Sequence, residues 1–283
     1  MSSLVVNTNM QAIQAYNDLS RTDNAMSTAI SQLSSGLQIQ TAADNPAGYV
    51  ISEALSFQST GYQAAMSNAQ DSTAMIQTAV GALNQITSIL QTMDQLAVAS
   101  ANSATTDSTA LSANEAEFTA LQNQIDQIAN SSSYGSTQLL NSSTAAYTVQ
   151  VGAFGLSGPG GNSFQQISFS ISAVTTGALL VNTSAVAVSG YASATSAIAA
   201  VQSALSYVDS VEANLGATQN ELSALVANLT VGNQNLQAAY SGMVDVNMAQ
   251  EMTTFSTDQI LMQTGVAMLA QAQTSPSMIL KLI

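Results

Sequence analysis

The chain has 283 residues, of which 46% are hydrophobic and only 6% are charged, and two basic residues against 16 carboxylates give a formal net charge of −14. This balance disfavours nucleic acids and anionic membranes as partners, because both are bound by clustered Lys and Arg. The chain also has no Cys and no His, which removes disulfides, thiolate metal sites and the usual general base. Composition therefore argues against an enzyme and predicts no cofactor and no metal.

Neither a secretion leader nor a membrane span is expected. The first 20 residues lack a basic segment and a continuous apolar run, so they do not predict a Sec signal peptide. The chain contains no stretch of 18 apolar residues, which is the length that a membrane-spanning helix needs.

The N-terminal arm predicts a long helix followed by a break. Apolar residues from Ile13 to Leu37 recur at steps of three and four, which is typical of a helix with one apolar face. The pattern stops at residues 44–48. Pro46 disfavours helix in the residue before it, and Gly48 permits unusual backbone dihedrals.

Two further helices are expected before the middle of the chain. A second apolar stripe runs over residues 66–96 at helical spacing. A polar break follows at residues 102–112, where Asp107 or Ser108 is the expected N-cap of the next helix. That helix carries a coiled-coil-like seam over residues 111–128.

The middle, residues 141–190, is rich in Ser, Thr and Gly and predicts a small β-region. Alternating runs at residues 147–151 and 164–171 indicate two strands, whose pairing the sequence leaves open. The region is a candidate for surface O-glycosylation, with a bare polar loop as the equal alternative. Asn141 and Asn182 also begin N-glycosylation sequons, a pattern that is common by chance.

The C-terminal arm again predicts helices. A helix is expected from Ser193, with an apolar seam over residues 198–236. A last amphipathic helix over residues 248–269 is expected to end near Pro276, because proline removes a helical hydrogen bond. The two arms are expected to pair antiparallel.

Apolar character continues to both ends of the chain. Periodicity alone favours an ordinary globular bundle over a polymer. Residues 4–6 and 278–283 would, however, be frayed and exposed in a monomer. Exposed apolar ends suggest docking onto other copies of the same chain.

An ordered series of short motifs runs through both arms. It comprises residues 6–9, 32–39, 42–48, 81–84, 96–98, 100–103, 123–126, 149–153, 215–220, 259–263, 269–272 and 276–283. The series resembles the signature of the bacterial flagellins, with order and spacing kept over about four-fifths of the chain. It fails only across the middle, which is the variable region of that family, and it reverses the preference for a globular bundle.

The resemblance implies a mainly α fold with long antiparallel helices forming a coiled-coil-like rod, terminal helices making a filament tube, and a small β-rich region near 141–190. It assigns residues 1–45 and 240–283 to tube helices, and residues 46–140 and 191–239 to rod helices. The chain then resembles a short flagellin that lacks large outer domains.

The resemblance also implies a function. The chain is expected to be an extracellular structural subunit that self-assembles into the flagellar filament for swimming, after export through the flagellar type III channel. Its expected partners are itself, an export chaperone, the filament cap and hook-associated proteins. The residues expected to pack in the tube, within or between subunits, are Leu4, Val5, Ile13, Leu33, Leu37, Phe255, Leu261, Leu269, Ile279 and Leu282.

Three other interpretations remain open at this point. A hook–filament junction protein would share the terminal architecture but form a short collar. An intracellular helical-bundle adaptor would be a stable monomer with ordered ends. An enzyme is the weakest alternative, because His, Cys and carboxylates clustered at ligand spacing are all missing.

A segment of the second helix resembles the one that the mammalian Toll-like receptor for flagellin reads. Familiar members of the family carry an Arg at the position of Thr92 and a basic residue at that of Asp94, whereas Leu96 and Glu117 match. Because Arg is a frequent interface anchor, weak receptor activation is expected.

The low charge itself suggests an acidic habitat. Near pH 2 the carboxylates would be mostly neutral, so a chain with two basic residues would carry little net charge. A filament rich in basic residues would repel itself there. Lineage drift or masking by glycans are the alternatives.

Overall fold

The protein is described here by a computed structural model covering residues 8–102, 106–141, 145–153, 165–183 and 186–280, without the side chains of residues 145 and 275–280. The chain divides into two compact units. We call residues 1–57 with 235–283 the terminal unit, and residues 58–234 the central unit.

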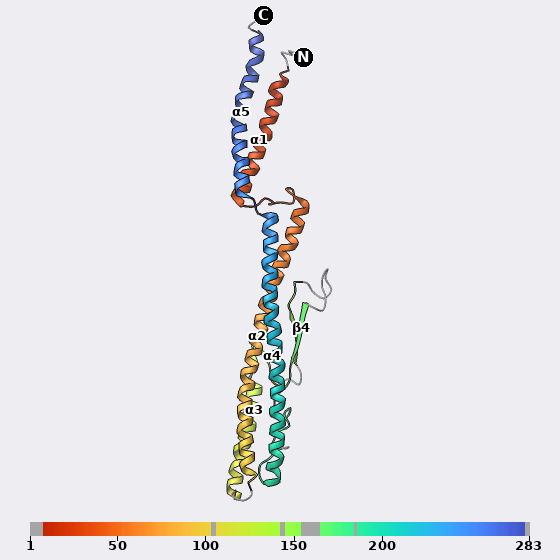
Figure 1. The fold of residues 1–283 in the computed structure, drawn as a ribbon, viewed down its shortest axis with the longest axis vertical. Helices are drawn as coiled ribbons and strands as arrows, with labels where there is room; N and C mark the ends of the chain where they lie inside the picture. Colours follow the sequence, from red (N-terminus) through yellow and green to blue (C-terminus); the bar gives the residue numbers. More distant parts are fainter. Residues whose placement is uncertain (1–7, 103–105, 142–144, 154–164, 184–185, 281–283) are drawn as a thin grey trace. The chain divides into compact units, whose positions relative to one another are not determined.

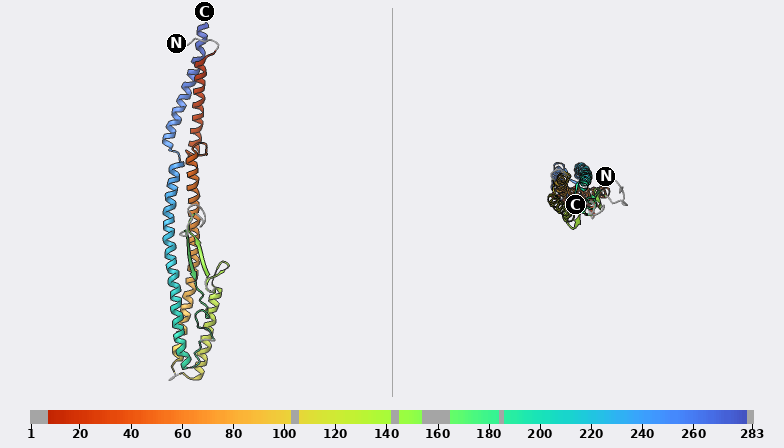
Figure 2. Two further views of the ribbon diagram at one scale, coloured as in Figure 1. Left: turned by 90° about the vertical axis from the view of Figure 1, so that its right-hand side faces the viewer. Right: turned by 90° about the horizontal axis from the view of Figure 1, so that it is seen from below.

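The terminal unit is built on two antiparallel helices, α1 (Met10–Ser35) and α5 (Met248–Leu280), which lie side by side in both views (Figures 1 and 2). Leu19 of α1 packs against Gly265 of α5, where an added Cβ would lie only 3.1 Å from the Leu19 side chain. The absence of a side chain at residue 265 therefore lets the two helices approach closely.

The terminal unit also contains the connectors that follow α1 and α4. Gly36 ends α1 with a φ of 75°, a left-handed conformation that glycine adopts without strain. Beyond it, Gln38 N donates to Val244 O at 2.6 Å and Val246 N donates to Gly36 O at 2.9 Å. These bonds make a small antiparallel bridge at the base of the helical pair.

The loop before α2 is held by two side chains. The Asp44 carboxylate accepts from Thr41 N at 2.8 Å and from Gln40 N at 3.1 Å, and these bonds lower the pKa of Asp44. A lowered carboxyl pKa stabilises the loop at pH values above the ordinary carboxyl pKa. That stabilisation is lost as the pH falls through the lowered pKa. Asn45 then caps α2, because its Oδ1 accepts from Gly48 N at 2.9 Å.

The central unit is built from α3 (Ser108–Ser131) and the greater part of α2 (Pro46–Ser100) and α4 (Tyr191–Val244), whose residues 46–57 and 235–244 belong to the terminal unit. The lower parts of α2 and α4 lie side by side in Figure 1. They run antiparallel, since Ser59 donates to Asn233 and Leu90 shares a surface hollow with Val201. Asp107, one of the two residues predicted as the N-cap, caps α3 by accepting from Ala110 N.

The apolar seams predicted for these helices form one core. Ile76, Leu83, Ile86, Leu90 and Met93 of α2 are fully buried. The residues that meet them from the other two helices include Phe118 and Ile125 of α3, and Val201, Val208, Leu215 and Leu222 of α4.

Val211 of α4 is buried in this core, whereas its neighbour Glu212 is half-buried at the edge of it. One Glu212 carboxylate oxygen is buried and has no hydrogen-bond partner among the described residues. Burial, helped by the nearby Asp209, raises the pKa of Glu212. A raised carboxyl pKa favours the fold at acid pH, and that contribution falls as the pH rises through the folded value.

The middle of the chain contributes two small antiparallel sheets. β1 (Ser133–Tyr134) pairs with β2 (Thr137–Gln138), and β3 (Ala145–Gln150) pairs with β4 (Gln166–Ile171). β3 and β4 confirm the two predicted strands and supply the pairing that the sequence left open. The first hairpin, which turns at Gly135 with a φ of 61°, was not predicted.

Three polar side chains of α3 hold irregular backbone on either side of residues 184–185, at residues 174–183 and 186–188. Glu115 accepts from Val188 N. Gln122, which is 2% exposed, donates to the carbonyls of Val181 and Val186. Asp126 accepts from both the backbone N and the hydroxyl of Thr176, each at 2.8 Å.

The structure confirms the predicted fold class: mainly α, with long antiparallel helices and a small β-region. One boundary prediction was wrong. The last helix was expected to end near Pro276, but α5 continues to Leu280. The carbonyl that Pro276 leaves without its helical donor belongs to Ala272, and it accepts a hydrogen bond from Asn9 instead.

Candidate assembly surface

The terminal unit has little core of its own. Among the described residues, only three of the 37 buried hydrophobic ones belong to it, namely Ala29, Ile39 and Val244. Yet thirteen of the nineteen large hydrophobic side chains that are strongly exposed in the same ranges lie there. An apolar surface of this extent on one small unit is typical of an interaction site.

The exposed apolar residues of α5 do not lie on one face. Met252, Ile260, Leu261, Val266 and Met268 are between 49% and 64% exposed, and apolar residues lie on every side of the helix. Polar residues are interspersed among them, and apolar residues spread round a helix in this way can be buried together only if partners cover several of its sides. α1 covers only one side of α5, so the other sides of α5 are available for contact with another molecule.

A groove of about 650 Å³ lies between α1 and α5. Half of its lining residues are apolar or Gly, among them Leu19 of α1 and Leu261 and Met268 of α5, and half are polar, among them Asp18 and Gln271. The groove therefore offers a mixed surface between the two helices.

The residues predicted to pack in a tube fall into three groups. Ile13 and Leu261 are exposed, at 46% and 49%. Leu33, Leu37, Phe255 and Leu269 are half-buried. Leu4, Val5 and Leu282 lie outside the described residues, and Ile279 lies in α5 without a described side chain.

Several exposed apolar residues were not predicted as packing positions, among them Met10, Ile260 and Met268. A search for one apolar stripe finds residues that share a face. On α5 the apolar residues occupy all faces, so the signal that would have found them is the high apolar content of the whole helix.

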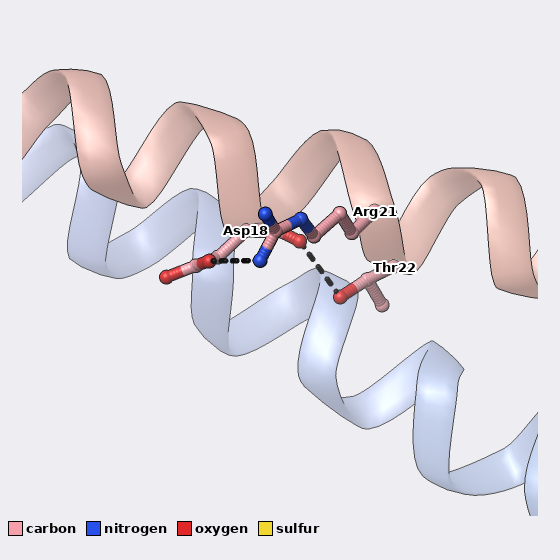
Figure 3. A network of polar contacts seen from close by, with 3 residues as sticks. All are labelled: Asp18, Arg21 and Thr22. Carbon is pink, nitrogen blue, oxygen red and sulfur yellow. Dashed lines mark hydrogen bonds and ion pairs between the residues drawn. The ribbon is translucent and has the colours of Figure 1, made fainter.

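Charge adds little to this surface. Arg21 lies 3.8 Å from the Asp18 carboxylate on α1, while Thr22 donates to the Asp18 carbonyl at 3.1 Å (Figure 3). The Arg21 and Asp18 side chains are 84% and 67% exposed. Exposed pairs of this kind contribute about 0–1 kcal/mol, so apolar contact must dominate any association.

The residues of the receptor-like segment lie in the central unit. On α2, Thr92, Asp94 and Leu96 are half-buried, and the Thr92 hydroxyl donates to Ser88 O at 3.1 Å. One Asp94 oxygen is buried without a hydrogen-bond partner in the described part of the chain. Glu117 is exposed on α3.

No group of three or more Asp or Glu side chains within the described ranges is arranged to hold a metal ion. Within the same ranges, every helix falls short of the length or apolarity needed to cross a bilayer.

Fold and surface together define a class: a helical protein whose paired terminal helices lack a core of their own and are suited to self-association. Residues 6–145 match the bacterial flagellin N-terminal helical region, and residues 198–283 match the bacterial flagellin C-terminal helical region. The chain is 36% identical over 280 residues to the flagellin of Halalkalibacterium halodurans, covering 99% of this chain and 100% of that one. The chain belongs to the bacterial flagellin family.

Two further similarities were found. The chain is 32% identical over 294 residues to the flagellar filament 33 kDa core protein of Treponema phagedenis, covering 99% of this chain and 100% of that one. The crystal structure of Bacillus cereus flagellin aligns with a TM-score of 0.47 and 26% identity over 62% of this chain and 94% of that one. Flagellins are structural proteins of the extracellular filament.

Proposed function

We infer that this chain is a structural subunit that self-assembles into a bacterial flagellar filament for swimming. Membership of the flagellin family over nearly its whole length supports this function. The observation that carries the mechanism is the exposed apolar surface of the terminal unit, where apolar residues are spread round α5 and α1 covers one side of it.

The terminal helices are the proposed polymerisation element. Burying a half-exposed Leu or Ile fully stabilises a contact by about 1 kcal/mol, and ten large apolar side chains of various kinds are strongly exposed on the described parts of α1 and α5. This gain is opposed by the conformational-entropy cost of ordering two long helices, because these helices have little internal core to offset that cost. Ordering of these helices is therefore coupled to the addition of the subunit to neighbours.

The proposed polymer is open and not a closed ring. A head-to-tail contact whose rotation does not close generates a helical fibre. Such a contact needs two different surfaces on one subunit. The exposed sides of α1 and α5 run in opposite directions and carry different side chains, which supports a heterologous contact.

We propose that residues 1–45 and 240–283 form the filament tube, that residues 46–140 and 191–239 form the rod helices, and that residues 141–190 form the variable insert. The division into a terminal unit with few buried residues and a central unit with a large core supports this assignment. The unit boundaries at residues 57 and 235 lie near, but not at, the proposed domain boundaries.

Export and assembly partners complete the proposal. The chain is proposed to leave the cell unfolded through the flagellar type III channel and to meet an export chaperone, the filament cap and hook-associated proteins. A chain without cysteine carries no disulfide that would obstruct threading. Loss of secretion in a strain whose flagellar export gate is deleted is the corresponding test.

Seeded polymerisation tests the function. The purified full chain, added to short fragments of its own filaments, is expected to elongate them into long fibres visible by negative-stain electron microscopy. Growth that stops at short collars, or a stable monomer under all conditions, would contradict a filament subunit.

Weak activation of the mammalian flagellin receptor is a further expected result. Thr92 supplies no guanidinium for the receptor, and the half-buried Asp94 adds a negative charge beside it. We expect at least about tenfold lower potency than a flagellin with Arg at the position of Thr92, which is the usual loss for one interface anchor. A cell reporter assay with matched monomer concentrations measures this, and Thr92→Arg should restore part of the potency. Full potency of the unaltered chain would refute the expectation.

A further inference from the structure

α5 continues past a proline near its C-terminal end. Pro276 has no backbone N–H, so it cannot donate to the carbonyl of Ala272, the residue four positions earlier. Proline inside a helix usually kinks or ends it, at a cost of about 3 kcal/mol. α5 nevertheless runs from Met248 to Leu280.

The orphaned carbonyl has a donor from the other end of the chain. Asn9 Nδ2 donates to Ala272 O at 2.7 Å, across a sequence separation of 263 residues. The other half of the same amide serves α1. Asn9 Oδ1 accepts from Ala12 N at 3.0 Å and is the N-cap of that helix.

The chemistry of this contact is specific to an amide. One atom of the Asn9 side chain must accept from α1 while another donates to α5. Asp is as good an N-cap as Asn but has no N–H to donate. Of all the carbonyls along α5, the one that Asn9 reaches is the one that Pro276 deprives of its helical donor.

We propose that Asn9, the Ala272 carbonyl and Pro276 form a terminal lock that sets the register of α1 against α5. When α1 is docked, Asn9 satisfies the orphaned carbonyl and α5 extends past Pro276. When α1 is not docked, the carbonyl loses this donor and the helix ends at the proline. The last turn of α5 therefore forms only together with the start of α1, so both ends of the subunit become ordered in one step. This lock builds on the filament function proposed above.

A cycle of substitutions in the full chain tests the lock. Asn9→Asp keeps the cap of α1 and removes the donor to Ala272, so it is expected to raise the subunit concentration left unpolymerised at equilibrium about tenfold. In a Pro276→Ala chain, the new residue supplies an N–H to the Ala272 carbonyl. Adding Asn9→Asp to that chain is expected to change the same concentration by less than about twofold.

Two comparisons keep the outcome decisive. Asn17→Asp adds the same charge to an exposed position of α1 and is expected to leave polymerisation unchanged. If Asn9→Asp abolishes polymerisation outright, the Pro276→Ala background should restore it. Equal effects of Asn9→Asp in both backgrounds would overturn the lock. Failure of the unaltered chain to polymerise would instead refute the filament function.

The extent of α5 gives a second readout. In seeded filaments of the unaltered chain, backbone hydrogen exchange is expected to be slow through residues 277–280. In Asn9→Asp filaments the protected segment should end before Pro276, and it should extend past residue 276 again when Pro276→Ala is added. Protection beyond Pro276 that is the same with and without the Asn9 amide would contradict the proposal.

Discussion

Replacing Ile260 and Leu261 together by Gln is expected to raise the subunit concentration at which filaments stop growing by at least about a hundredfold. Both side chains are about half exposed or more in the isolated chain, at 61% and 49%. In a filament they would be buried, so the variant loses apolar burial and also places two amides in an apolar contact. Sedimentation of seeded filaments at several total concentrations measures the change.

The same variant should leave the isolated chain intact. Gln is a good helix former, and substitutions at exposed positions usually change the free energy of unfolding by no more than about 0.5 kcal/mol. Conservative replacements, Ile260→Leu with Leu261→Met, keep the apolar surface and serve as the matched control. Normal polymerisation of the Gln variant would show that this surface of α5 is not an interface. A fall in the melting temperature of the monomer would show that the two residues belong to an internal core.

Asp126→Ala is expected to lower the free energy of unfolding of the monomer by about 2 kcal/mol. The Asp126 carboxylate accepts two hydrogen bonds from Thr176, which is only 5% exposed to solvent. Removing the carboxylate leaves the buried N–H and hydroxyl of Thr176 without an acceptor. The free-energy cost of desolvating each group is then no longer offset by a hydrogen bond. Urea unfolding of the monomer, followed by far-UV circular dichroism, measures the loss.

Two variants bracket this result. Asp126→Asn retains an acceptor for one of the two donors of Thr176 and should lose about half as much. Asp71→Ala removes a carboxylate from an exposed position of α2 in the same unit and is expected to change the stability little. Equal effects of Asp126→Ala and Asp71→Ala would mean that the hydrogen bonds to Thr176 do not stabilise the central unit.

The helices of the central unit could be predicted because their stability comes from one apolar seam each. The spacing of Ile76, Leu83, Ile86 and Leu90 follows directly from the face that α2 buries. The bonds from α3 to the irregular backbone could not be predicted in this way. Gln122 and Asp126 find partners 50 or more residues away, and polar residues at such positions usually face solvent.

The terminal unit was predicted only in part, for a different reason. The helices α1 and α5 could be recognised from their apolar content, and the resemblance to flagellins indicated their role. The continuation of α5 past Pro276 could not, because local rules end a helix at proline. The donor that offsets the missing bond lies on Asn9, at the opposite end of the chain, and its arrival depends on tertiary structure.

The proposed mechanism requires that the terminal helices become ordered only when the subunit joins the filament. Backbone hydrogen exchange of the unaltered chain, measured in the dilute monomer and in the filament, is a direct test of this coupling. In the monomer, residues 10–35 of α1 and residues 248–272 of α5 are expected to exchange rapidly, while the buried part of α2 around Ile86 is protected. In the filament all three segments should be protected. Terminal helices as strongly protected in the dilute monomer as the core of α2 would contradict the coupling.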